Sequence, residues 1–181
     1  ERMYAVSSNE RNGLSSNYIN NFAKLNDSIF WVTAWEGGLF LITEGMDEPS
    51  KMKFIKIDSD GAGTVINAGN QIFYGSTKKL WRIDLKTYEK KPIDVVNKVL
   101  QGKEIASIIG NKAGDVWIGT ENLLIKYSHK TKDVDKLEIN LGTQKKLISL
   151  EQDLDGNIWA ATHNSILRID ITNNCYYTDT T

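Results

Sequence analysis

Two stretches of this sequence, "GDVWIGTENLLIKY" at residues 114–127 and "DGNIWAATHNSILRID" at residues 155–170, repeat one order of features. Each begins with a polar turn and continues through a tryptophan, a small residue, a threonine and an apolar run that contains a base. Repetition every few tens of residues is typical of proteins that use one supersecondary unit several times. The fold therefore depends on how many times the chain repeats this unit.

Two further rows align with the first two on an aromatic residue. They are "DSIFWVTAWEGGLFLI" at residues 27–42 and "NQIFYGSTKKLWRID" at residues 70–84. The aromatic anchors of the four rows lie 42, 44 and 42 residues apart and are Trp31, Phe73, Trp117 and Trp159. An apolar segment precedes each anchor and two more follow it, and four strands in about 40–45 residues are the signature of a β-propeller blade. The sequence predicts an all-β fold of propeller blades, each with four antiparallel strands.

The apolar runs have the composition of strands. They are short, rich in Ile, Val, Trp, Phe and Tyr, and bounded by Gly, Asn, Asp and Ser. The expected first strands lie at residues 19–25, 64–66, 105–109 and 147–150, and the expected fourth strands begin near Phe54, Ile93 and Leu137. Residues 92–100, "PIDVVNKVL", are compatible with a short helix, but the repeat favours a fourth strand followed by a loop.

Some strands are apolar at successive positions, as at residues 80–83 and 123–125. Such a strand has both faces covered, as happens when a blade lies between two neighbours. We expect each aromatic anchor to fill the wedge between adjacent blades. Arg82, Lys126 and Arg168 follow their anchors at one register, so we expect their stems to pack against the next blade with the charge at the edge.

The ends of the chain both look like outer strands. Residues 2–6, "RMYAV", and residues 175–178, "CYYT", each resemble the fourth strand of a blade, whereas a closed ring of four blades would need only one of them. We therefore expect one propeller segment over residues 1–181, an open arc from a larger propeller, with blades at about 14–57, 58–98, 99–140 and 141–181. Residues 1–13 would be the last strand of a preceding blade and a loop. The first residue is Glu1 and not methionine, so we expect an excised piece whose uncovered end faces need other blades or another copy.

Composition narrows the possible partners. Lysine and arginine number 22 against 23 acidic residues, and the balance shows no basic face for a nucleic acid. The longest apolar stretch, residues 30–42, contains Glu36 and falls short of the roughly 20 residues that cross a bilayer. Any membrane contact would come from other parts of a longer protein. The single cysteine, Cys175, excludes an internal disulfide and a cysteine-based zinc site.

The sequence shows no catalytic or metal-binding constellation. The two histidines, His129 and His163, are expected in different loops at opposite ends of a blade. Asp153 and Asp155 before Gly156 are explained by a hairpin turn, because the bidentate acid of a calcium loop is missing. No Gly-x-Ser-x-Gly nucleophile motif occurs. We therefore predict no catalytic residue, no metal site and no cofactor.

The positions that differ between matched rows are the candidates for ligand binding. They lie in the loop between the second and third strands, on the rim of a propeller where ligands usually bind. Mixed charges, amides and one exposed tryptophan suit a polar ligand with an apolar face, such as an oligosaccharide, although solvated hairpin tips would look similar. The candidate residues are Trp35, Glu36, Lys78, Glu121, Asn122, His163 and Asn164.

The rows resemble a known family of repeats. The stretches "GLSSNYINN" at residues 13–21, "FWVTAWEGGLFLI" at residues 30–42 and "DGNIWAATHNSILRID" are similar to two-component regulator propeller repeats, which occur in the extracytoplasmic sensor region of Bacteroides-type hybrid histidine kinases. The resemblance covers nearly all of the chain in four copies. It departs from the family pattern at Thr33, Ala34 and Phe73, and rows two to four lack the glycine of the Gly-Leu pair.

The resemblance implies a periplasmic sensor segment of an inner-membrane protein, a propeller of seven blades, a homodimer partner and a histidine kinase elsewhere in the full-length protein. Three functions remain open from the residues. The first is a non-catalytic sensor segment that responds to an oligosaccharide. The second is a propeller enzyme, a polysaccharide lyase or hydrolase, for which the rim offers only the scattered Glu36, Glu121 and His163. The third is a propeller that acts only as a protein-interaction scaffold.

Overall fold

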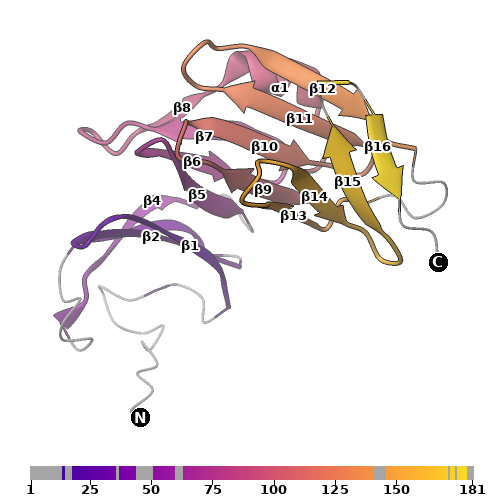
Figure 1. The fold of residues 1–181 in the computed structure, drawn as a ribbon. Helices are drawn as coiled ribbons and strands as arrows, with labels where there is room; N and C mark the ends of the chain where they lie inside the picture. Colours follow the sequence, from indigo (N-terminus) through magenta and orange to yellow (C-terminus); the bar gives the residue numbers. More distant parts are fainter. Residues whose placement is uncertain are drawn as a thin grey trace.

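The computed structural model describes residues 14, 18–35, 37–43, 51–59, 63–140, 146–170, 172–173 and 175–178. These residues form four four-stranded antiparallel sheets and one short helix (Figure 1). The predicted all-β fold of four-stranded propeller blades is therefore confirmed. Residues 1–13, for which we predicted a strand of a preceding blade, and the candidate Glu36 lie outside the described residues.

Each sheet takes its strands from one continuous stretch of chain. The first blade contains β1 (Ile19–Asn26), β2 (Ile29–Ala34), β3 (Gly38–Ile42) and β4 (Phe54–Asp58). The second contains β5 (Thr64–Ala68), β6 (Gln71–Gly75), β7 (Leu80–Ile83) and β8 (Lys90–Pro92). The third contains β9 (Ser107–Gly110), β10 (Asp115–Gly119), β11 (Leu123–Ser128) and β12 (Val134–Glu138). The fourth contains β13 (Ser149–Gln152), β14 (Ile158–Ala161), β15 (Ile166–Asp170) and β16 (Cys175–Thr178).

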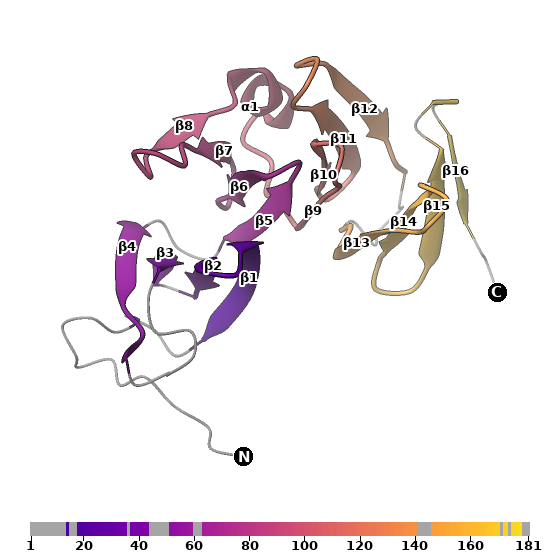
Figure 2. The same ribbon diagram turned by 60° about the vertical axis from the view of Figure 1, so that its left-hand side comes forward.

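The four blades lie side by side in the order in which they occur in the chain. Within each sheet the strands pair in chain order, and the first strands of successive blades contact one another: β1 with β5, β5 with β9, and β9 with β13. Figure 2 shows these first strands along the inner side of a curved row, with the fourth strands on its outer side. The first and fourth blades lie at opposite ends of the row (Figure 2).

The segment after β7 corrects one expectation. A strand beginning near Ile93 was predicted, but the fourth strand ends at Pro92 and α1 (Asp94–Leu100) follows it. Val96 and Leu100 are fully buried one helical turn apart, so the helix packs its apolar side on the core between the second and third blades. Asp94 in the first turn and Lys98 in the last suit the helix dipole.

Asn97 of α1 makes the hydrogen bonds to Leu80 that the short strand β8 does not make. The Leu80 amide of β7 donates to Asn97 Oδ1 at 2.8 Å, and Asn97 Nδ2 donates to the Leu80 carbonyl at 3.2 Å. The Ile93 amide also donates to this carbonyl, at 3.1 Å. The main chain of Leu80 is therefore satisfied on this side although no residue of β8 lies opposite it.

Three of the four aromatic anchors fill the space between blades, as predicted. Trp31, Phe73 and Trp117 are buried, and each belongs to a core cluster that contains residues of the next blade. The expectation is wrong for Trp159, whose side chain is 38% exposed. The fourth blade is the last described one, so no described blade covers its anchor.

The three repeated bases lie directly beside their anchors. Arg82 is the strand partner of Phe73, Lys126 of Trp117, and Arg168 of Trp159. Lys126 Nζ lies 5.3 Å from the centre of the Trp117 ring, and Arg168 donates to Asn157 Oδ1 at 2.9 Å. These contacts lie within the blade of each base, and the packing of their stems against the next blade stays a prediction.

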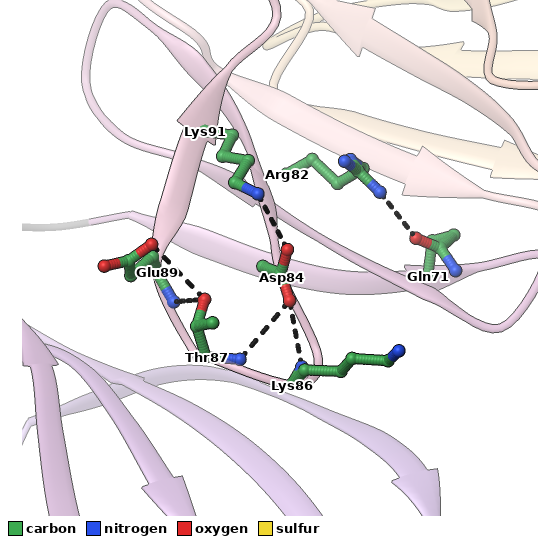
Figure 3. A network of polar contacts seen from close by, with 7 residues as sticks. All are labelled: Gln71, Arg82, Asp84, Lys86, Thr87, Glu89 and Lys91. Carbon is green, nitrogen blue, oxygen red and sulfur yellow. Dashed lines mark hydrogen bonds and ion pairs between the residues drawn. The ribbon is translucent and has the colours of Figure 1, made fainter.

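The turn between β7 and β8 is organised around one carboxylate. Asp84 Oδ1 accepts hydrogen bonds from the amides of Lys86 at 3.0 Å and Thr87 at 3.3 Å, and Asp84 Oδ2 lies 2.8 Å from Lys91 Nζ (Figure 3). Asparaginyl and aspartyl side chains often close turns in this way because they reach amides two or three residues ahead. Arg82 lies beside this turn and donates separately to Gln71 Oε1 at 3.2 Å (Figure 3).

Candidate ligand-binding rim

The turns between second and third strands share one rim of the molecule with the segments that enter the first strands. The Trp35 amide donates to the Tyr18 carbonyl at 2.7 Å, which ties the turn after β2 to the entry of β1. In the later blades this tie crosses to the next blade: the Ile105 amide donates to the Thr77 carbonyl at 2.8 Å, and the Leu147 amide to the Thr120 carbonyl at 3.0 Å. These hydrogen bonds connect the rim from the second blade to the fourth.

A buried hydroxyl closes each of the last three rim turns. Thr120 Oγ1 donates to the Leu123 carbonyl at 3.1 Å and accepts from the Leu123 amide at 3.0 Å. Thr162 Oγ1 accepts from the Ser165 amide at 3.1 Å, and Ser76 Oγ donates to the Lys79 carbonyl at 3.3 Å. The hydroxyl satisfies the turn from inside, so the two residues at the tip are left to face solvent.

The predicted site residues occupy these tips. Six of them are exposed and lie on the rim turns of the four blades: Trp35, Lys78, Glu121, Asn122, His163 and Asn164. Within the described part of the chain, no hydrogen bond or ion pair joins candidates from different turns. Asn122 Oδ1 instead accepts from Lys103 Nζ at 3.3 Å. The structure thus places the candidates on one rim without bringing them into a single cluster.

One hollow on the rim lies beside Trp35. It measures about 720 Å³ and is lined by Tyr18, Ile19, Asn20 and Trp35. The Tyr18 side chain is 76% exposed and the Trp35 side chain 53% exposed. Two aromatic rings and one amide around an open hollow suit a ligand that has both apolar faces and hydroxyl groups.

Sequence reasoning found Trp35 but missed its three neighbours in the hollow. Tyr18 lies three residues before Asn21, which is the strand partner of Thr33. The residues at the equivalent position of the third and fourth blades are Glu104 and Lys146. Those two residues form an ion pair at 3.4 Å. The signal in the sequence was a tyrosine at a position where the third and fourth blades have charged residues. The hydrogen bond between the Trp35 amide and the Tyr18 carbonyl shows that the two residues lie side by side.

Two of the described ionisable groups with shifted pKa values, Asp153 and His129, lie in turns. Hydrogen bonds from Trp159 Nε1 and from Asn157 lower the pKa of Asp153, which closes the turn before β14 as the sequence predicts. His129 lies in the turn after β11, at the other rim from His163, where burial lowers its pKa. Among the described residues, no group of three or more His, Cys, Asp or Glu side chains could hold a metal ion.

No family model matches the sequence, and no curated protein matches it. Several solved structures match the fold of this chain. The extracellular domain of BT4673 from B. thetaiotaomicron, assigned to a hybrid two-component system, matches with a TM-score of 0.66 and 22% identity over 91% of this chain and 21% of its own. The extracellular domain of BT3049, assigned to another such system of B. thetaiotaomicron, matches with a TM-score of 0.67 and 18% identity over 97% of this chain and 23% of its own.

One enzyme shares the architecture. Virginiamycin B lyase from Staphylococcus aureus matches with a TM-score of 0.65 and 11% identity over 88% of this chain and 54% of its own.

Within the described residues, no helix is both long and apolar enough to span a membrane. The chain spans about a fifth of the length of the two-component extracellular domains. The resemblance that the rows indicate is confirmed for the fold: these blades are built like those of the extracellular domains of Bacteroides two-component systems.

Proposed function

We propose that this chain is a non-catalytic segment of the extracytoplasmic sensor region of a hybrid two-component histidine kinase, and that its rim binds an oligosaccharide. The full-length protein would span the inner membrane, with these blades in the periplasm. The fold-level match to extracellular domains of two-component systems supports the sensor role. The residues support the ligand class through the Tyr18–Trp35 hollow.

The observation that carries the ligand proposal is the pair of exposed rings at the hollow. Pyranose rings present faces of C–H groups that pack on aromatic rings, and their hydroxyls bond amides such as that of Asn20. The Trp35 backbone amide is held by the Tyr18 carbonyl at 2.7 Å, so the main chains that carry the two rings are tied together. A tied pair loses less conformational freedom on binding than two independent side chains.

Signalling requires more than binding. A ligand changes the state of a receptor only when it binds one arrangement better than another. In this proposal the oligosaccharide at the rim favours one arrangement of the sensor region and its homodimer partner, and the kinase responds to that arrangement. The remaining blades of the propeller would supply the rest of the binding surface.

The test is calorimetric titration of a panel of oligosaccharides against the complete extracytoplasmic region and two variants. Trp35→Ala should weaken binding by about tenfold or more, equivalent to about 1.4 kcal/mol. Phe22→Ala is the matched control, because Phe22 is an exposed aromatic residue of β1 that does not line the hollow. Equal affinity in wild type and Trp35→Ala would remove this rim from the ligand site, and turnover of a polysaccharide would establish an enzyme instead.

A further inference from the structure

Three basic side chains gather where the second and third blades meet, on the rim opposite Trp35. Arg82 comes from β7, and His129 and Lys132 come from the turn after β11. Lys132 Nζ lies 3.1 Å from His129 Nδ1. The His129 ring lies edge-on to Phe73 with ring centroids 5.6 Å apart, and Phe73 is the strand partner of Arg82. We name Arg82, His129 and Lys132 the basic cluster.

The turn after β11 has the same backbone geometry as the turn after β7. The Tyr88 amide donates to the carbonyl four residues before it at 2.7 Å, and the Lys132 amide does the same at 2.8 Å. Both residues have a left-handed backbone, with φ angles of 61° and 68°. Lys132 therefore occupies the position of Tyr88, and His129 occupies that of Leu85, three residues earlier in each turn.

The positions of the basic cluster are apolar at the contact between the first and second blades. Leu85 and Tyr88 pack on the core cluster of Trp31, which also contains Leu41, the strand partner of Trp31. At the next contact the same three positions carry the three bases. This change brings like charges together and reduces apolar burial, and both effects are unfavourable. Packing between the blades therefore does not explain the basic cluster.

The basic cluster has no carboxylate partner among the residues that the structure describes. Asp84 lies two residues after Arg82, but its carboxylate is bound by Lys91 Nζ at 2.8 Å and by two turn amides (Figure 3). Asp133 follows Lys132 along the chain and is exposed, without an ion pair to it. The charge of the three bases is therefore left for a group from outside this part of the chain.

All three side chains have hydrogen-bond donors to offer. A lysine ammonium can only donate, so the contact of Lys132 with His129 Nδ1 assigns the hydrogen of the neutral ring to Nε2. Arg82 uses one N–H on Gln71 Oε1 at 3.2 Å and keeps further donors (Figure 3). Several N–H donors with positive charge are what an oxyanion needs, because each of its oxygens accepts hydrogen bonds.

We propose that the basic cluster binds an oxyanion group, such as sulfate, phosphate or carboxylate. The bound group accepts hydrogen bonds from the three bases and relieves the repulsion among their charges. The site lies on the other rim from the Trp35 hollow, so it goes beyond the proposed oligosaccharide site. A free anion and the charged substituent of a saccharide present the same oxygens, and the experiments below separate these two sources.

Anion binding at this place is coupled to a proton on His129. Burial, followed by the charges of Lys132 and Arg82, lowers the pKa of His129. The other ionisable groups that face the ring are Tyr127, whose own pKa is raised by burial, and Lys112 in the turn before β10. None of these groups brings a negative charge at neutral pH. An oxyanion therefore favours the imidazolium form and raises the pKa of His129.

The first test uses the fact that the sequence has two histidines, His129 and His163. Their ring signals are titrated by NMR in sodium sulfate and in sodium chloride at equal ionic strength. Sulfate should raise the pKa of His129 by about 1 and leave that of His163, on the opposite rim, unchanged. By linkage, sulfate should bind up to about tenfold more tightly as the pH falls from about 8 to about 5. The same pKa of His129 in both salts would overturn the proposal.

Variants separate a built site from general charge. Lys132→Tyr introduces the residue type of the preceding turn, so the protein should unfold at the same or a higher temperature than wild type while sulfate no longer raises the pKa of His129. Arg82→Gln keeps a donor without the charge and should also lose most of the sulfate response. Lys130→Met is the matched control, because Lys130 is an exposed base of the same turn outside the basic cluster. An equal loss in Lys130→Met would reduce the effect to net charge and contradict the site.

Calorimetric titration identifies what carries the group. The probes are sodium sulfate, a sulfated disaccharide and the same disaccharide without sulfate. Tighter binding of the sulfated disaccharide than of free sulfate supports an acidic saccharide as the source, and equal binding supports a free anion. Trp35→Ala should leave sulfate binding unchanged, so failure of this proposal and failure of the oligosaccharide proposal are distinguishable. Binding to phosphatidylglycerol vesicles without any response to sulfate would assign the bases to a membrane surface and overturn the proposal.

Discussion

Tyr88 of the second blade lies edge-on to Trp31 of the first, with ring centroids 6.0 Å apart and ring planes at 66°. The ring is presented by a left-handed residue: Tyr88 has a φ of 61°, and its amide donates to the Asp84 carbonyl at 2.7 Å. A turn of one blade thus completes the core of its neighbour. The stability of the contact between blades should therefore depend on turn residues as well as on strands.

Truncating that ring should destabilise the chain. Tyr88→Ala removes the edge-on contact and part of the cover of Trp31, so we expect the free energy of unfolding to fall by about 1–2 kcal/mol. Tyr18→Ala is the control, because Tyr18 is 76% exposed and should change stability by no more than about 0.5 kcal/mol. Urea unfolding followed by circular dichroism measures both. Equal losses in the two variants would mean that the ring contact adds nothing.

Acid should weaken the turn that presents Tyr88. The Lys91 ammonium and then the amides of Lys86 and Thr87 hold the pKa of Asp84 well below its usual range. Since the folded-state pKa is depressed, this carboxylate contributes stability above its unfolded pKa of about 4 and loses it as the pH falls toward the folded pKa. We expect the unfolding temperature to drop between about pH 5 and pH 2.

Asp84→Asn should show a shallower drop over the same range. Part of the slope should remain, because turn hydrogen bonds also lower the pKa values of Asp153 and Asp170. Lys91→Met, which removes the main cause of the shift at Asp84, should behave like Asp84→Asn. Unfolding temperatures measured by scanning calorimetry across this pH series provide the check, and parallel curves for wild type and Asp84→Asn would refute the role of this turn.

A second loss of stability is expected at milder acidity. Burial, followed by the charges of Lys132 and Arg82, lowers the pKa of His129, whose Nδ1 lies 3.1 Å from Lys132 Nζ. The unfolded chain therefore takes up this proton first, so the contribution is full above the unfolded pKa of about 6.5 and declines as the pH falls below it. His129→Phe keeps a ring against Phe73 without a titrating group. The variant should flatten the unfolding temperature between about pH 7 and pH 5, and an unchanged slope would contradict the assignment.

The inner strands of the second and third blades approach too closely for an added methyl group. A Cβ at Gly110 would lie 2.6 Å from Ala68 Cβ, whereas one at Gly75 would meet nothing nearer than 3.5 Å. We expect Gly110→Ala to cost roughly 1–3 kcal/mol and Gly75→Ala to be neutral or slightly stabilising. Ala68→Gly should recover part of the loss in Gly110→Ala. A double-mutant cycle by urea unfolding tests this, and purely additive effects would place the clash elsewhere.

The blades could be predicted because their signal is local and repeated. Trp31, Phe73 and Trp117 recur at a nearly constant spacing, and each recurrence carries the pattern of three strands with it. The helix after Pro92 was harder to foresee, because Val95 and Val96 favour strands and only the finished core shows that Val96 and Leu100 are buried together.

Features that depend on contacts between blades could not be predicted from the repeated sequence rows. Trp159 matches the other anchors in sequence, yet its exposure is decided by which blade lies beside it. Tyr88 and His129 both cover anchors, but they share neither residue type nor position within their turns. The hollow at the rim joins Trp35 to Tyr18, which lies before β1 and whose carbonyl accepts a hydrogen bond from the Trp35 amide.

The side chain of Asn97 has a consequence for how such chains avoid aggregation. A sheet whose outer strand is cut short leaves amides and carbonyls exposed, and these can recruit the strand of another molecule. Asn97 imitates a peptide group by both accepting from and donating to Leu80, and α1 covers this end of β7. The outer border of a blade can thus exchange strand for helix without becoming a template for intermolecular sheet growth.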